Sequence, residues 1–120
     1  MRLVAAVVMF VHAVAHLPGF LVSWQLASLA ELPYRTTVLA GRLNIGDAGT
    51  RVTGVVWALL AIAFASAGGG LLLRTPWWNQ VAWLATVVSL VMCVLGLPET
   101  RVGVLVNLAL GAWLLFGAGR

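Results

Sequence analysis

The chain has 120 residues, of which 62% are hydrophobic and only 8% charged, and its formal net charge is +4. A water-soluble domain carries about 25% charged residues, so this composition leaves too little polar surface for a soluble fold. The positive charge comes from arginines spread along the chain, and no basic cluster of the kind that binds nucleic acid is visible. The sequence therefore predicts a membrane protein that does not bind nucleic acid.

Four apolar stretches predict four transmembrane helices, at about 3–24, 51–73, 77–97 and 101–118. A hydrocarbon core about 30 Å thick needs about 20 apolar residues for each helical crossing. Each stretch also carries a row of small or polar residues at helical spacing, which lets helices approach closely in lipid. We therefore predict an all-α fold: a single integral membrane domain over residues 1–120 that forms a four-helix transmembrane bundle.

The first helix is followed by the one long connection in the chain. We expect this helix to continue as far as Glu31, because the residue before Pro33 avoids helical geometry. The connection, 25–50, mixes polar and apolar residues and predicts a long interfacial loop between helices 1 and 2. Asp47 is expected to cap the start of the second helix with its carboxylate.

The last two helices begin with recognisable signals. Thr75 and Pro76 predict the N-cap and first residue of the third helix. Trp77 and Trp78 follow at once, as in the aromatic belt found at membrane interfaces. A tight turn that begins at Pro98 then leads into the fourth helix.

Four crossings place both termini on one side of the membrane. The arginines are almost evenly divided between the two sides, so the positive-inside rule gives little direction, and we take both termini as cytoplasmic. The chain has no lysine and is rich in Arg, Ala, Gly and Val, a pattern typical of GC-rich bacterial genomes. The expected location is therefore the bacterial inner (cytoplasmic) membrane.

Polar residues inside the predicted spans mark a candidate ligand site. His16 lies about 12 Å below Trp24, and Asn107 about 9 Å below Arg101, at a rise of about 1.5 Å per residue. These similar depths predict a small-molecule or lipid pocket between helices 1 and 4, beneath the 25–50 loop. The candidate ligand-binding residues are His12, His16 and Asn107 in the spans and Arg42, Asn44 and Asp47 in the loop. The structural alternative is that His16 and Asn107 only hydrogen-bond each other, or a backbone carbonyl freed by Pro18, and hold the helices in register.

A metal or haem site is the second interpretation of the histidines. His12 and His16 are four residues apart, so both face the same side of a helix and could share a metal ion. Met9 and Cys93 could add soft ligands for copper, and one histidine could serve as an axial ligand of haem. No cofactor is favoured, since the spans contain no carboxylate to orient a metal-binding imidazole.

These features favour a small membrane protein of accessory or binding type. The first alternative is a small transporter or channel that acts as a homo-oligomer, and the second is a haem- or metal-binding membrane subunit. Signatures of common enzymes, such as G-x-S-x-G and H-E-x-x-H, are missing, so an enzyme is the less favoured class. Expected partners are the lipid bilayer and either further copies of the chain or a larger membrane complex.

Overall fold

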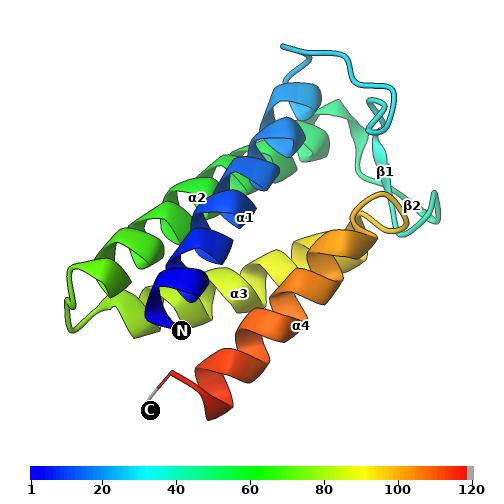
Figure 1. The fold of residues 1–120 in the computed structure, drawn as a ribbon. Coiled ribbons are helices and arrows are strands. Elements are labelled where there is room, and N and C mark those ends of the chain that lie inside the picture. The colour runs from blue at the N-terminus through cyan, green and yellow to red at the C-terminus, as the bar shows by residue number, and fades with distance from the viewer. Residues whose placement is uncertain (119–120) are drawn as a thin grey trace.

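The computed structural model describes residues 1–118 as four helices and one small hairpin (Figure 1). The predicted all-α class is confirmed, and the hairpin lies in the long connection between the first two helices. The elements are α1 (Arg2–Ser23), β1 (Thr37–Val38), β2 (Leu43–Asn44), α2 (Gly46–Leu72), α3 (Trp78–Leu95) and α4 (Arg101–Phe116).

Three of the four helices, α1, α2 and α3, are long and apolar enough to cross a membrane. The fourth, α4, is apolar but has only 16 residues, a length of about 24 Å. The longest dimension of the described chain is 43 Å, close to the thickness of a bilayer with its headgroups. Large apolar side chains cover the outer surface of all four helices, as expected of a surface in contact with lipid.

The helices pack in chain order, and the arrangement is open on one side. In Figure 1, α1 and α2 lie side by side, α3 packs on α2, and α4 packs on α3. Small residues allow the closest approach: Ala6 of α1 and Ala67 of α2 are completely buried between their helices. In contrast, α1 and α4 diverge and barely touch each other. Buried residues of all four helices nevertheless form one core cluster, and the arrangement is open between α1 and α4.

The first helix ends earlier than the sequence predicts. It stops at Ser23 rather than near Glu31, because Gln25 adopts a positive φ of 56° and turns the backbone away from the helix axis. The amide of Leu26 then donates to the carbonyl of Leu21 at 2.8 Å, which satisfies the end of the helix. The Trp24 indole donates to the Arg51 carbonyl at 3.0 Å and attaches this end of α1 to α2.

The starts of α2 and α3 also differ from expectation. Asp47 is not the N-cap of α2, since the helix already begins at Gly46 after Ile45. Asp47 instead lies in the first turn, where its negative charge still interacts favourably with the helix dipole. Thr75 is likewise not the cap of α3, which starts at Trp78, and its hydroxyl donates to the carbonyl of Gly70 at 3.2 Å.

The close contact of α1 and α2 at Gly54 gives a first prediction. A methyl group at this position would lie 2.7 Å from the Trp24 ring and 2.8 Å from Ser23, so Gly54→Ala must push α1 and α2 apart. We expect a loss of about 1–3 kcal/mol of stability, measured by thermal unfolding in detergent. The control is Gly69→Ala in the same helix, where nothing lies within 4 Å and the better helix former should stabilise by up to about 1 kcal/mol. Equal effects of the two variants would contradict this packing.

Candidate functional site

A closed cycle of four buried side chains links three of the helices. His12 and His16 come from α1, Ser89 from α3 and Asn107 from α4, and each is at most 5% exposed. His12 Nε2 bonds to Asn107 Oδ1 at 3.2 Å, and Asn107 Nδ2 bonds to Ser89 Oγ at 2.9 Å. Ser89 Oγ then bonds to His16 Nε2 at 2.6 Å, and His16 Nδ1 closes the cycle at the carbonyl of His12, also at 2.6 Å. We call this set the hydrogen-bond cycle.

The direction of every bond in the hydrogen-bond cycle follows from two backbone carbonyls. Asn107 Nδ2 donates to the Gly103 carbonyl at 2.9 Å, so Asn107 Oδ1 is an acceptor and His12 Nε2 must donate to it. His16 Nδ1 faces the His12 carbonyl and must donate, so His16 Nε2 accepts from the Ser89 hydroxyl. The cycle is therefore complete with both imidazoles neutral, and the lone pair of His12 Nδ1 is left without a partner among residues 1–118.

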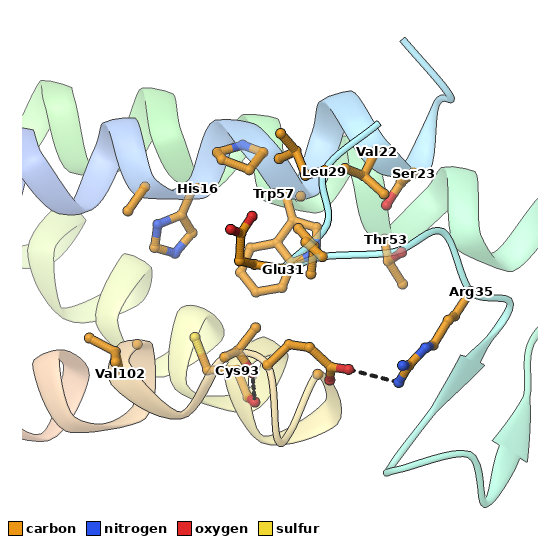
Figure 2. Close-up of a pocket in the computed structure, with 18 of the residues that line it drawn as sticks. His16, Val22, Ser23, Leu29, Glu31, Arg35, Thr53, Trp57, Cys93 and Val102 are labelled. Atoms are coloured by element: carbon orange, nitrogen blue, oxygen red, sulfur yellow. Dashed lines mark hydrogen bonds and ion pairs between the residues drawn. The ribbon is translucent and has the colours of Figure 1, made fainter. Parts of the chain in front are cut away.

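A cavity of about 780 Å³ lies between α1 and α4, on the side where these helices diverge. Its volume is in the range of sites that hold drug-sized ligands. His16 lines it from α1, Trp57 from α2 and Cys93 from α3 (Figure 2). His12 of α1 is also part of its wall. Much of the remaining wall is apolar and comes from valines of α1 and α4: Val7, Val8, Val11, Val102 and Val106.

The connection between α1 and α2 covers the cavity at one end of the helices. Its hairpin is attached to α3 by the amide of Leu39, which donates to the Leu95 carbonyl at 2.8 Å. Arg35 reaches across to the α3–α4 turn and forms an ion pair with Glu99 at 2.7 Å (Figure 2). On the opposite side, the Tyr34 hydroxyl donates to Asp47 of α2. The loop is thus fixed on both sides of the opening that it spans.

The structure brings together the three candidate residues from the predicted spans. His12 and His16 line the cavity, and Asn107 lies behind them in the hydrogen-bond cycle. The partners differ from the expected pair, because Asn107 bonds directly to His12 and reaches His16 only through Ser89. A role of these three residues in ligand binding remains a prediction.

The three candidate residues from the loop lie outside the cavity wall. Arg42 is in the hairpin turn, where its amide donates to the Leu39 carbonyl at 3.2 Å. Asn44 is in β2 and accepts the amide of Gly46 at 2.9 Å. Asp47 contacts the cavity only indirectly, through Tyr34, which does line it.

Sequence reasoning missed several residues of the cavity wall. Trp57 reads as a lipid-facing aromatic residue in an apolar helix, and nothing in the sequence distinguishes it from the other tryptophans. Glu31 and Arg35 belong to the long connection, and Arg35 pairs across the cavity with Glu99, which lies far along the chain. Only contacts between distant segments reveal these roles, since the relevant partners are far apart in the sequence.

The geometry gives little support to a shared metal ion at His12 and His16. The two rings lie edge to face with centroids 4.4 Å apart, and three of their four nitrogens are already engaged in the hydrogen-bond cycle. Within residues 1–118, no three His, Cys, Asp or Glu side chains are grouped closely enough to hold a metal. Metal binding would require the hydrogen-bond cycle to open. The free nitrogen of His12 is better placed to accept a hydrogen bond.

Comparison of the chain with protein-family models, curated proteins and solved structures finds no match. The function is therefore argued from the cavity and the residues around it.

The hydrogen-bond cycle predicts opposite effects for two neighbouring hydroxyls of α3. Ser89→Ala should destabilise by about 1–3 kcal/mol, because it leaves buried groups of His16 and Asn107 without partners. Thr86→Val should be neutral or stabilising by up to about 2 kcal/mol, since the buried Thr86 hydroxyl has no hydrogen-bond partner. Thermal unfolding of both variants in the same detergent measures the difference. A similar loss in both would mean that the cycle does not stabilise the fold.

The attachment of the loop to α2 predicts the titration of Tyr34, the single tyrosine of the chain. The hydrogen bond to Asp47 raises the pKa of the Tyr34 hydroxyl, with smaller contributions from desolvation and from the nearby negative charge. The bond should stabilise the loop below the ordinary phenol pKa of about 10 and be lost as the pH rises through the raised value. We expect Asp47→Ala to lower the midpoint of the phenolate absorbance titration, and Asn44→Ala to leave it unchanged. Coinciding midpoints of the wild type and Asp47→Ala would contradict this contact.

Proposed function

We propose that this chain is a small integral membrane protein that binds an apolar or amphipathic small molecule in the cavity between α1 and α4. Its membrane location is supported by three helices of sufficient length and hydropathy and by the apolar side chains on their outer surfaces. We place α4 in the same layer, because it packs on α3 and exposes Leu105, Leu108 and Leu115. A somewhat short helix can be accommodated by local thinning of the bilayer.

The observation that carries the binding function is the cavity itself. Two helices that pack well would fill a space of about 780 Å³ with side chains, as α1 and α2 do along their length. Here α1 and α4 remain apart, while the loop is fixed over the opening by contacts on both sides. This combination of an open wall and an anchored cover is typical of a binding site and is difficult to explain by packing alone.

The composition of the wall indicates how a ligand would be held. Valines of α1 and α4 offer an apolar surface at the depth of the acyl chains, and polar groups gather near the loop. A molecule with an apolar body and one polar end would match both regions. We infer that it enters laterally from the bilayer between α1 and α4, since these helices form few contacts that would have to break.

A pair of adjacent substitutions on α1 tests this function. Ala15 lines the cavity, whereas Val14 is 64% exposed and lies outside the wall. We expect Ala15→Phe to fill the cavity and reduce labelling by a photoreactive diazirine analogue of dodecanol at residues 29–38 and 102–106 at least about tenfold. Val14→Phe should leave labelling there unchanged, because its ring points away from the cavity wall.

The measurement is competition of this labelling by excess dodecanol in neutral maltoside micelles, read peptide by peptide by mass spectrometry. Competition at the cavity segments of the wild type and of Val14→Phe, together with its loss in Ala15→Phe, is the expected result. Labelling that cannot be competed, or that is the same in both variants, would show that the cavity does not bind such molecules.

A further inference from the structure

The acidic residues of this chain are concentrated around the cavity. The chain has seven arginines against three acidic residues, yet two of those three acids, Glu31 and Glu99, line the cavity. Among residues 1–118, Arg35 is the one arginine in the cavity wall. Two negative charges against one positive charge leave the cavity wall with a formal charge of −1, in a chain whose formal charge is +4. The charge of the cavity is therefore opposite in sign to that of the whole molecule.

Glu31 carries the uncompensated charge. Arg35 is engaged by Glu99 at 2.7 Å, and within residues 1–118 Glu31 forms no ion pair. Figure 2 shows its carboxylate pointing into the cavity from the loop. Because the loop lies at the end of the helices, this charge is near the membrane interface, where it remains partly hydrated at little energetic cost.

Several polar groups of the wall can accept a hydrogen bond but have no proton left to donate. The hydroxyls of Thr50 and Thr53 already donate to backbone carbonyls at 2.8 and 2.7 Å, and those of Thr100 and Tyr34 donate to the Cys93 carbonyl and to Asp47. His12 Nδ1 presents a lone pair without a partner, as the direction of the hydrogen-bond cycle requires. A ligand that donates hydrogen bonds and carries positive charge would complement these groups.

We propose that the occupant of the cavity is a single-chain amphipathic amine. Its ammonium group lies beside Glu31, near the aromatic face of Trp57, and its apolar chain runs along the valines of α1 and α4. A cation close to an indole gains further attraction from the negative face of the ring. The inference rests on the proposed function and adds the charge of the ligand to it.

The same ammonium chemistry has two sources, a free amphipathic amine and the headgroup of a membrane lipid such as phosphatidylethanolamine. The volume of about 780 Å³ suits one chain, so we expect a free amine to compete better than the two-chain lipid. Both ligands are used in the experiment, because each of them tests the ammonium site. The ratio of their strengths of competition then identifies which of the two sources is preferred.

The test uses the full chain in neutral maltoside micelles and the photoreactive dodecanol analogue described above. The competitors share one chain length and differ only in their polar group: dodecylamine, dodecanol and dodecanoate, with phosphatidylethanolamine as the fourth. We expect dodecylamine to compete about tenfold better than dodecanol in the wild type, and dodecanoate to be the weakest. Competition by dodecanoate equal to or better than that by dodecylamine would overturn the inference.

The deciding variant is Glu31→Gln, which removes the charge and keeps the shape. It should abolish the preference for dodecylamine while leaving competition by dodecanol unchanged, and the unchanged competition also shows that the variant is folded. The matched control is Arg74→Gln, which removes a charge in the turn between α2 and α3, outside the cavity wall, and should keep the preference. A preference that survives Glu31→Gln refutes the ammonium site. A complete lack of competition by any ligand refutes the proposed function instead.

Discussion

The hydrogen-bond cycle is the constraint on which the open side of this molecule depends. Asn107 of α4 is held by His12 of α1 and Ser89 of α3, and hardly any other contact joins α1 to α4. The four side chains of the cycle are at most 5% exposed, so a polar group left unpaired among them is costly and the complete cycle is favoured. The cycle thus fixes how far apart α1 and α4 stand, and with it the width of the cavity.

The cavity exists because two kinds of contact act at different depths. Near the middle of the helices, the hydrogen-bond cycle holds α4 against α3 and beside α1. At the end of the helices, the loop is held by the Arg35–Glu99 ion pair on one side and by Tyr34 and Asp47 on the other. Between these levels no large side chain of either helix fills the gap, because the wall there consists of Pro18, Gly19 and Val22 from α1 and Val102, Gly103 and Val106 from α4. Polar contacts thus bound the cavity at both levels, and apolar side chains line it between them.

Much of the fold could be predicted because long apolar helices leave a strong pattern in a sequence. Long apolar stretches give the helices, and the depth of a polar residue follows from its distance to the helix end. That reasoning placed His16 and Asn107 at similar depth, and the structure connects them through Ser89. It missed the early end of α1, because a positive φ at Gln25 has no signal in a residue type that rarely adopts it.

The sequence by itself determined the class of fold, the number and approximate positions of the apolar helices and the presence of buried polar residues in the first and last of them. These are local properties, set by composition and by the helical repeat. The tertiary structure alone decided that α1 and α4 diverge, that Glu31 faces the cavity and that Arg35 pairs with Glu99. Such features depend on crossing angles and on the path of a connecting loop, which arise from many weak contacts between segments distant in the chain.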